Sequence, residues 1–507
     1  MNTYKECLIA NKFIITKHAA LYYFKNMTIL MAYLCFASAT SNCYNKIMND
    51  IPATEKRIPD YVGSILDLLE KEGHRAYVAG GAVRDIVLGT TPHDYDVATS
   101  ARPEQTLDIF KRAGLDYYDN GIKHGTVTAI TSDGNVEVTT FREDGSYSDL
   151  RRPDEVSFKT SIEEDVRRRD FTINAMYMDS DGVIHDPEGG QMDAADHIIR
   201  TVGDPAARFE EDALRILRGI RFCSRLGFDI EPETLLAMET HCEELKKISG
   251  ERIAAELIGI VTGKYAPRAI RTGWKVMSVI IPEIAVCRGF DQRSVFHDRD
   301  VLEHTLDVLS EIPFVEGQGR DPELAMAALF HDLGKPECFV LEDGQGHMKG
   351  HPLVSEKIAE RVLTELKCSK QFVNNVCLLV RLHDTYLKPD RVRVHRFMCQ
   401  YPMEILNKLK VLQRADILAH SPLGLNRLKR LEELNAISED LKASGAIFDM
   451  TNLAISGRDI ISLGVKEGPA VGGILSQVFE LYLDGKCPNS KDALIIEAQR
   501  LISTKSV

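Results

Sequence analysis

The most informative stretch of the chain is residues 76–98, which read AYVAGGAVRDIVLGTTPHDYDVA. An apolar run at residues 76–79 predicts a strand, and the dipeptide Gly80-Gly81 predicts a tight turn into a helix. Such a turn leaves bare backbone N–H groups beside a helix N-terminus, where they can bind phosphate. Arg84 adds a cation to the start of that helix. A glycine turn of this kind is usually only a turn, so its meaning depends on the residues around it.

Two carboxylates, Asp94 and Asp96, follow ten residues after Arg84. Residues i and i+2 of a strand point to the same side, so these like charges are expected to hold a cation between them. Mg²⁺ fits because it is hard, prefers oxygen and shares its sites with substrate phosphates. Glu137, in the alternating run at residues 136–140, is expected on a neighbouring strand as a third catalytic carboxylate. An exposed position in an alternating strand explains Glu137 equally well.

Two further segments carry arginines suited to nucleotide binding. Residues 168–175 read RRDFTINA, and forked guanidinium groups match the oxygens of a triphosphate. Residues 211–222 read EDALRILRGIRF, a helical pattern whose apolar face lies opposite Asp212, Arg215 and Arg218. A solvated helix face explains the charges, but it does not explain the excess of arginines over acids. An Asp and an Arg one turn apart can read the Watson–Crick edge of a base, since one accepts and the other donates.

These motifs, in this order and spacing, resemble those of the bacterial class II tRNA nucleotidyltransferases, the CCA-adding enzymes, whose family also includes bacterial poly(A) polymerases. The motifs are GGAVRD, DYDVAT, VEVTTFR, SYSDLRRPD, RRDFTINAM and EDALRILRGIRF. The resemblance covers the chain from about residue 55, and it is specific because the motifs occur together. It implies an α+β multidomain protein. A polymerase-β-like nucleotidyltransferase head, with a mixed sheet and helices, would be followed by an all-α neck, an HD-type body and a tail.

The resemblance also implies a role for each matching residue. Metal binding would fall to Asp94 and Asp96. The nucleotide-binding residues would be Gly81, Arg84, Arg168, Arg169, Asn174, Asp212, Arg215, Arg218 and Arg221. Among them, Asp212 and Arg215 would act as a protein template that chooses CTP or ATP. Residues 142–154 would form a flexible loop implicated in switching from C to A addition, and the RNA 3′-hydroxyl would attack the α-phosphate in line and release pyrophosphate.

The helical second half contains a separate group of histidines and aspartates, which resembles an HD-superfamily phosphohydrolase domain. Mixed nitrogen and oxygen ligands suit a second divalent metal, with Mn, Ni, Fe and Mg as candidates. By this resemblance the core ligands are His304, His331, Asp332 and Asp416, and the accessory ligands are His351, His383 and Asp384. Phosphatase or 2′,3′-cyclic phosphodiesterase activity and a retained scaffold that helps to grip tRNA are both open interpretations.

Five segments are expected along the chain. They are an N-terminal extension at residues 1–47, a nucleotidyltransferase head at 55–195, a helical neck with the base-selecting helix at 196–285, an HD domain at 297–420 and a helical tRNA-binding tail at 421–507. The extension carries an apolar run at residues 27–39 that is short for a bilayer span. A signal peptide is one interpretation of it, and a start-site overcall with translation beginning at Met48 is the preferred one.

Composition narrows the class of partner. The formal net charge of −13 argues against indiscriminate coating of nucleic acid, but it leaves room for a local basic surface. Eleven scattered cysteines without a CxxC pair are typical of reduced cytoplasmic thiols, and a cytoplasmic location is expected. The expected partners are tRNA, CTP and ATP, with neither DNA nor a membrane among them.

Three alternatives stay beside CCA addition. An enzyme that adds only A, or a poly(A) polymerase, would share the head motifs, although the C-terminal residues 499–507 lack the basic run that such polymerases tend to have. An HD metal phosphohydrolase with a nucleotide-binding head is a rival of another class, and the pair Asp94 and Asp96 argues against it. A non-catalytic RNA-binding protein would need neither metal site.

Overall fold

The computed structural model describes residues 58–144 and 156–505, and the chain divides into two compact units, residues 1–64 and 65–507. The predicted extension at residues 1–47 lies outside the described residues, as does most of the predicted loop at residues 142–154. The names head, neck, body and tail are kept below for the predicted ranges, whose boundaries remain predictions. Within the described residues, we find no helix that combines the length and the apolar character needed to cross a membrane.

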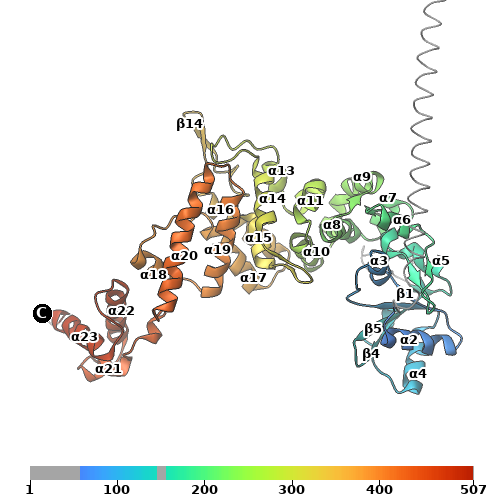
Figure 1. The fold of residues 1–507 in the computed structure, drawn as a ribbon, viewed down its shortest axis with the longest axis horizontal. Helices are drawn as coiled ribbons and strands as arrows, with labels where there is room; N and C mark the ends of the chain where they lie inside the picture. Colours follow the sequence, from blue (N-terminus) through green and yellow to red (C-terminus); the bar gives the residue numbers. More distant parts are fainter. Residues whose placement is uncertain (1–57, 145–155, 506–507) are drawn as a thin grey trace, which may run out of the picture. The chain divides into compact units, whose positions relative to one another are not determined.

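The head is built on a mixed seven-stranded sheet, as predicted (Figure 1). Its strand order is β3-β4-β5-β2-β1-β8-β9, and within it only the β2–β5 pair is parallel. The strands are β1 (Ala76–Ala79), β2 (Asp96–Thr99), β3 (Asp116–Tyr118), β4 (Thr126–Ile130), β5 (Asn135–Thr140), β8 (Tyr177–Met178) and β9 (Ile184–His185). Alternating buried and exposed residues along β4 and β5 show why these segments form strands with one covered face.

The glycine turn between β1 and the next helix forms as predicted. Gly80 has φ 73°, a left-handed conformation that favours glycine, and helix α3 (Gly81–Val87) starts at the second glycine. The expectation of a DxD pair within one strand was wrong in part. Strand β2 begins only at Asp96, so Asp94 lies in a bend just before it and its side chain is 94% exposed.

The remaining elements of the head flank this sheet. Helix α4 packs beside β4, and a separate hairpin of β6 and β7 stands at the base of the predicted loop. The bounds are α2 (Asp60–Lys71), α4 (Pro103–Ala113), β6 (Arg142–Asp144), β7 (Val156–Phe158), α5 (Ile162–Asp165), η2 (Val166–Arg168), η3 (Thr172–Asn174) and α6 (Gly190–Ala195).

The neck is helical, and its centre is α8, the helix predicted to select the base. Helix α8 packs against α10 and α11, and its apolar residues join one large buried cluster that continues into the body. The bounds are β10 (Ile198–Ile199), α7 (Pro205–Glu211), α8 (Leu214–Leu226), β11 (Asp229–Ile230), α9 (Pro232–His241), α10 (Gly250–Thr262), α11 (Ala266–Thr272), α12 (Trp274–Ile280) and α13 (Glu283–Cys287).

The body is also helical, in agreement with the predicted class. Helix α15 is buried from Leu324 to Phe330, so apolar residues surround it on every side and its sequence shows no amphipathic stripe. The helices are α14 (Val301–Glu311), α15 (Pro322–Phe330), α16 (His351–Glu365), α17 (Lys370–Leu382), α18 (Arg391–Met398) and α19 (Met403–Leu418), and α20 (Arg427–Ala443) follows within the range of the predicted tail. Two short hairpins interrupt them, β12 (Phe314–Val315) with β13 (Gly319–Arg320) and β14 (Val340–Glu342) with β15 (Gln345–His347).

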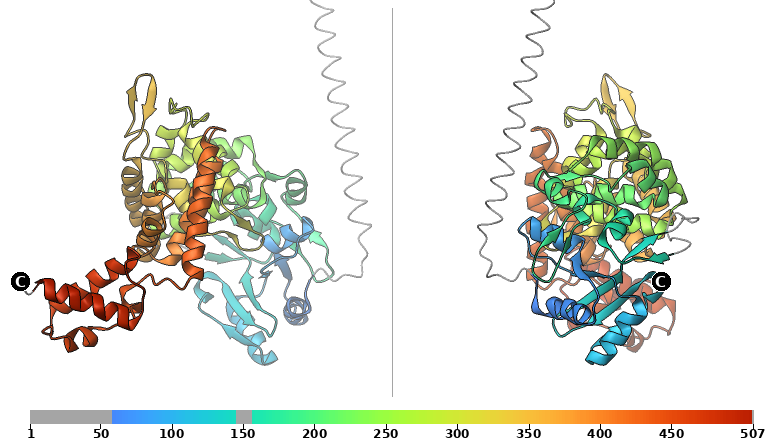
Figure 2. Two further views of the ribbon diagram at one scale, coloured as in Figure 1. Left: turned by 60° about the vertical axis from the view of Figure 1, so that its left-hand side comes forward. Right: turned by 90° about the vertical axis from the view of Figure 1, so that its right-hand side faces the viewer.

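The tail ends in three helices that pack on one another (Figures 1 and 2). They are α21 (Gly457–Ser462), α22 (Pro469–Leu483) and α23 (Lys491–Lys505). Their apolar residues form a cluster of their own, separate from the core shared by neck and body.

A matched pair of leucines tests the core of the neck. Leu257 on α10 is fully buried beneath α8, whereas Leu236 on α9 is 64% exposed. We expect Leu257→Ala to lower the free energy of unfolding by about 2–5 kcal/mol, because it removes buried apolar surface and leaves a cavity. Leu236→Ala should change it by less than about 1 kcal/mol. Denaturant unfolding followed by circular dichroism measures both, and equal effects would contradict the packing described.

Candidate functional site

The edge of the head predicted to bind metal forms where β2 and β5 run in parallel. The register pairs Asp96 with Glu137, so their side chains project from adjacent strands at the same level. Desolvation, followed by the negative charge of Glu137, raises the pKa of Asp96. Arg169 opposes this shift and Asp94 adds to it. Carboxylates that repel one another at one edge are a donor set for a hard divalent cation.

The glycine turn lies beside the arginines. A Cβ atom at Gly80 would lie 3.2 Å from Nη1 of Arg169, so a larger residue would press on that guanidinium. Arg84, in the first turn of α3, donates from Nη1 to Oδ1 of Asn174 at 2.8 Å. Its Nε and Nη2 both donate to the neighbouring Asp85 at 2.9 and 2.7 Å. Two segments far apart in the sequence therefore hold Arg84 in one orientation.

The tandem arginines Arg168 and Arg169 share a buried acidic partner that the sequence analysis did not single out. Arg168 donates from Nε to Oδ1 of Asp165 at 2.8 Å, and Arg169 donates from Nη2 to Oδ2 at 3.2 Å. Arg169 also donates from Nε to the hydroxyl of Tyr177 at 2.8 Å and from Nη1 to the carbonyl of Asn174 at 3.0 Å. Both guanidinium groups are thus fixed before any phosphate arrives.

Asp170 holds Arg218, an arginine that comes from the neck. Its Oδ2 accepts from Nε of Arg218 at 2.8 Å, and its Oδ1 accepts from the backbone N–H of Phe171 at 2.8 Å and from Nδ2 of Asn174 at 3.3 Å. Burial acts to raise the pKa of Asp170, but the charge and hydrogen bonds of Arg218 outweigh it and lower the pKa to about 2.

Asp212 and Arg215, the pair predicted to select the base, are held by neighbours on both sides. Asp212 accepts from the backbone N–H of Leu214 at 3.0 Å through Oδ1, and its Oδ2 accepts from Arg252 at 2.9 Å. Arg215 is 7% exposed and donates to Glu211 at 2.6 Å. The charged face of this helix is therefore largely a set of paired charges, which the alternative of a solvated helix face does not describe. A simple solvated face is the wrong description of Arg215.

These side chains converge on one cavity of about 500 Å³. Of the predicted residues, its lining includes Gly81, Arg84, Asp96, Arg168, Arg169, Asn174, Asp212, Arg215 and Arg218. Glu137 and Asp94 are not part of the lining. Glu137 lies beside Asp96 on the neighbouring strand, and Asp94 lies in the bend just before β2. Arg221 also lies outside the lining and pairs with Glu256 at 2.8 Å.

The sequence analysis did not single out four of the lining residues as site residues: Asp170, Leu214, Phe222 and Arg252. The ring of Phe222 faces three guanidinium groups, with Arg84, Arg218 and Arg221 between 5.4 and 5.6 Å from its centroid. Phe222 belongs to the quoted helix motif and could have been found there. Arg252 comes from α10 in another part of the chain, and only the fold brings it to Asp212.

The predicted histidines and aspartates of the body also come together. Asp332 directs Oδ2 toward Nε2 of His331 at 3.2 Å and of His304 at 3.4 Å. Its Oδ1 faces Nε2 of His351 at 3.1 Å and of His383 at 3.6 Å. One buried carboxylate therefore stands between two pairs of imidazoles.

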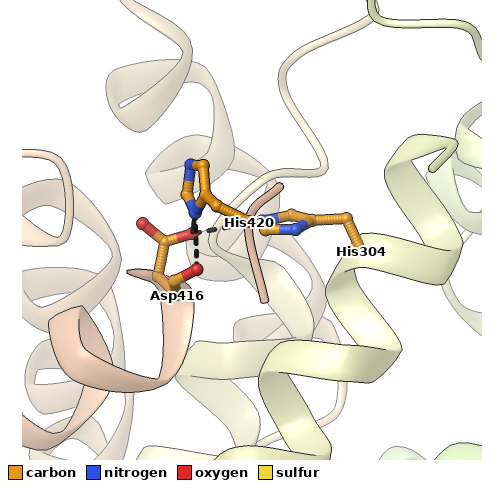
Figure 3. Close-up of side chains that lie close together, drawn as sticks. All are labelled: His304, Asp416 and His420. Atoms are coloured by element: carbon orange, nitrogen blue, oxygen red, sulfur yellow. Dashed lines mark hydrogen bonds and ion pairs between the residues drawn. The ribbon is translucent and has the colours of Figure 1, made fainter. Parts of the chain in front are cut away.

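Asp416 completes this histidine–aspartate cluster from α19. Its Oδ1 lies 3.1 Å from Nε2 of His304, and His420, one turn later, lies beside both (Figure 3). His420 was not predicted; it lies two residues beyond the end of α19, where the chain turns back toward Asp416. The ring of His297 lies 4.4 Å from that of His420 between centroids, tilted by 39°, and it too had no signal in the sequence.

The predicted accessory Asp384 lies outside the three metal-competent groups found among the described residues. It is 3.6 Å from Arg427 at the rim of a second cavity, of about 240 Å³, over the cluster. Three cationic residues, Lys335, Lys349 and Arg427, line this cavity. Asp384 is therefore a rim residue in the structure, and its assignment as a ligand finds no support there.

The head cavity brings together Asp96, the glycine turn, the tandem arginines and residues of helix α8, an arrangement that fits a nucleotidyltransferase. Family comparisons agree: residues 76–200 match the poly A polymerase head domain, 227–287 the probable RNA and SrmB-binding site of polymerase A, and 352–498 tRNA nucleotidyltransferase domain 2. The chain is 34% identical to the CCA-adding enzyme of Levilactobacillus brevis over 85% of its own length and 95% of the relative. It is 32% identical to that of Streptococcus mutans over 87% and 97%. The chain belongs to the CCA-adding enzyme family.

Solved structures share this fold. The crystal structure of the Bacillus stearothermophilus CCA-adding enzyme in complex with CTP aligns with a TM-score of 0.65 at 28% identity, and the alignment covers 90% of this chain and 99% of that one. The Thermotoga maritima CCA-adding enzyme, complexed with tRNA, aligns with a TM-score of 0.55 at 20% identity over 89% and 97%. The second likeness supports the fold alone.

The lowered pKa of Asp170 makes a prediction about pH. A carboxyl whose pKa is lower in the folded state contributes stability above its unfolded pKa of about 3.9, and that contribution is lost as pH falls through about 2. We expect Asp170→Asn to cost about 2 kcal/mol of unfolding free energy at pH 7, and the cost should shrink below pH 4. Denaturant unfolding across pH measures it. The exposed Asp133→Asn is the control, and a pH-independent cost for Asp170→Asn would contradict the pairing.

Proposed function

We propose that the head adds C, C and A to the 3′ end of tRNA from CTP and ATP, with release of pyrophosphate and without a nucleic-acid template. One observation carries this proposal: a single cavity collects Asp96, the glycine turn, the tandem arginines and the pair Asp212 and Arg215. The name shared by the relatives in Levilactobacillus and Streptococcus supports the reaction, and the bound CTP of the Bacillus relative supports CTP as a substrate.

The triphosphate is held by groups that the structure has already fixed. The backbone N–H groups at the start of α3 and the guanidinium of Arg84 bind phosphate oxygens at one end of the cavity. Arg168 and Arg169 bind the others as forked donors. Such positioning brings the α-phosphate into line with the RNA 3′-hydroxyl, and phosphoryl transfer depends mainly on this alignment and on charge stabilisation.

Asp94 and Asp96 would hold Mg²⁺, with Glu137 as the third carboxylate beside them. The raised pKa of Asp96, caused by enclosure and by Glu137, is the mark of an anionic edge that a divalent cation would stabilise. When bound, Mg²⁺ would supply positive charge to the attacking oxygen and to the departing pyrophosphate. Glu137, which lies level with Asp96 in the sheet, orients that edge.

Asp212 and Arg215 would choose the base. Cytosine and adenine both present an amino donor beside a ring-nitrogen acceptor on their Watson–Crick edges, whereas uracil and guanine present a carbonyl beside an N–H. A carboxylate that accepts and a guanidinium that donates therefore suit C and A together. In the structure the two side chains contact Arg252 and Glu211, so the incoming base competes for donors and acceptors that are already oriented.

The reaction is tested with tRNA that ends before CCA, before CA or before A, together with labelled CTP or ATP and Mg²⁺. We expect all three ends to be completed to CCA. Asp96→Asn should lower addition by at least about 10³-fold, because the carboxylate edge loses a charge, while Asp108→Asn on the exposed face of α4 should leave it unchanged. Addition of A without C would favour an enzyme that adds only A. Long A tails on unrelated RNA would favour a poly(A) polymerase. No incorporation at all would overturn the proposal.

The histidine–aspartate cluster favours a second function for the body, metal-dependent phosphohydrolysis. Burial acts to raise the pKa of Asp332, but the neighbouring His331 and Lys335 outweigh it and hold that pKa well below its usual range. Nζ of Lys335 lies 2.6 Å from Oδ2 of Asp332, but neither buried carboxylate oxygen has a hydrogen bond of good geometry, and nor does Nε2 of His331. Buried donor atoms in this state fit a divalent metal, for which Mn, Ni, Fe and Mg are candidates. Lys349 and Arg427 would attract a phosphate to the cavity above.

Metal content tests the cluster independently of the head. In an Asp96→Asn background, which weakens the head site, we expect the purified chain to retain divalent metal after dialysis against Mn²⁺. Asp332→Asn should abolish this retention, because Asp332 faces both pairs of imidazoles. Asp343→Asn, in the exposed turn between β14 and β15, is the control. Metal content that is the same with and without Asp332 would show that the cluster is only a scaffold.

A further inference from the structure

A fully buried carboxylate, Asp165, lies behind the triphosphate arginines. Four donors surround it. Oδ1 accepts from Nε of Arg168 at 2.8 Å and from the backbone N–H of Arg142 at 3.2 Å. Oδ2 accepts from the hydroxyl of Tyr177 at 2.8 Å and from Nη2 of Arg169 at 3.2 Å. Asp165 does not line the head cavity, so it acts only through these neighbours.

Charge explains why the carboxylate is ionised in so enclosed a place. Burial acts to raise the pKa of Asp165, but the charges of Arg168 and Arg169 and the hydrogen bond from Tyr177 outweigh it and lower that pKa. A buried charge is tolerated when it is paired and fully hydrogen-bonded. In return, Asp165 gives the two guanidinium groups a fixed anchor on the side away from the cavity.

Tyr177 ties this anchor to the sheet. Its hydroxyl donates to Asp165 and accepts from Nε of Arg169, and its ring lies 4.7 Å beneath the guanidinium of the same arginine. Tyr177 belongs to β8, which pairs with β1, the strand that leads into the glycine turn. The arginines and the turn are therefore positioned by one piece of sheet.

Arg168 connects the same anchor to base selection. Its side chain bonds to Asp165, while its backbone carbonyl accepts from Nη2 of Arg215 at 2.8 Å. The carbonyl of Arg208 and the carboxylate of Glu211 hold Nη1 of Arg215. A shift of the Arg168 backbone would move one of the three supports of the selecting guanidinium.

We propose that Asp165 is a positioning residue that sets both the grip on the triphosphate and, through the backbone of Arg168, the orientation of the base-selecting Arg215. The inference rests on the proposed function of the head. It extends that function by making nucleotide affinity and nucleotide choice depend on one residue that touches neither the phosphates nor the base.

A purely structural ion pair is the competing explanation, and it predicts a different result. Loss of such a pair would lower thermal stability and the amount of folded enzyme, but each folded molecule would bind nucleotide as before. A positioning role changes KM and base discrimination in the folded molecules. Steady-state kinetics at matched folded concentration separates the two.

The experiment uses the full chain with Asp165→Asn, which keeps the size of the side chain and removes its charge. We expect KM for both CTP and ATP to rise about 10-fold, with a smaller change in kcat, because Arg168 and Arg169 lose their anchor and bind the triphosphate less tightly. Incorporation of UMP relative to CMP should rise about 5-fold, because Arg215 loses a fixed support. Glu163→Gln, an exposed acid on the same helix α5, is the matched control and should resemble wild type.

Tyr177→Phe is a second variant in case the buried asparagine prevents folding. It removes only the hydroxyl between Asp165 and Arg169, so KM for both nucleotides should rise about 3-fold with a melting temperature close to wild type. The proposal is overturned if the folded variants saturate with CTP and ATP like wild type and discriminate equally well. A wild-type enzyme that adds no nucleotide would instead defeat the proposed function, and direct titration with CTP would still compare the variants.

Discussion

Repulsion among arginines is the constraint on which the head cavity depends. Arg84, Arg168, Arg169, Arg215 and Arg218 all line one space in a chain whose formal net charge is −13. Each has an acid or a carbonyl as a hydrogen-bond partner. Asp165 and Glu211 lie close in sequence to the arginines that they hold, whereas Asp170 lies 48 residues from Arg218. The acids keep the cations apart and immobile. The conformational entropy of these side chains is therefore lost during folding and not when a nucleotide binds.

Much of this could be predicted from the sequence, because the local signals are strong. Two glycines after an apolar run produced the turn, and period-2 alternation produced β4 and β5. The register that sets Asp96 beside Glu137 could not be predicted, since parallel pairing depends on the whole sheet. The same holds for Arg252, which reaches Asp212 only because α10 packs on α8. Local patterns show which residues carry chemistry, and long-range packing chooses their partners.

The histidine–aspartate cluster illustrates the same division. The His-Asp dipeptide marked a metal-competent position, and the structure adds His420 from the turn after Asp416. The dipeptide His383-Asp384 looked equivalent in sequence, yet only its histidine faces the cluster while Asp384 turns to Arg427. Adjacent residues at the end of a helix point in different directions, so a dipeptide motif cannot assign both members to one site. With its head and body, one chain thus presents two separate candidate centres for phosphate chemistry.

The dual contact of Asp212 has a consequence for how nucleotide choice could change over time. Its Oδ1 accepts from the backbone N–H of Leu214, the first residue of α8, so the side chain proposed to read the base also satisfies an N–H group at the start of that helix, as a cap does. Replacement by a residue that cannot cap would weaken the helix together with the reading of the base. An asparagine would retain the cap but present a donor where the carboxylate accepts. Asparagine is therefore the substitution that this position accepts most easily, because it preserves the fold. It would change only the pattern of hydrogen bonds that the side chain offers to the base.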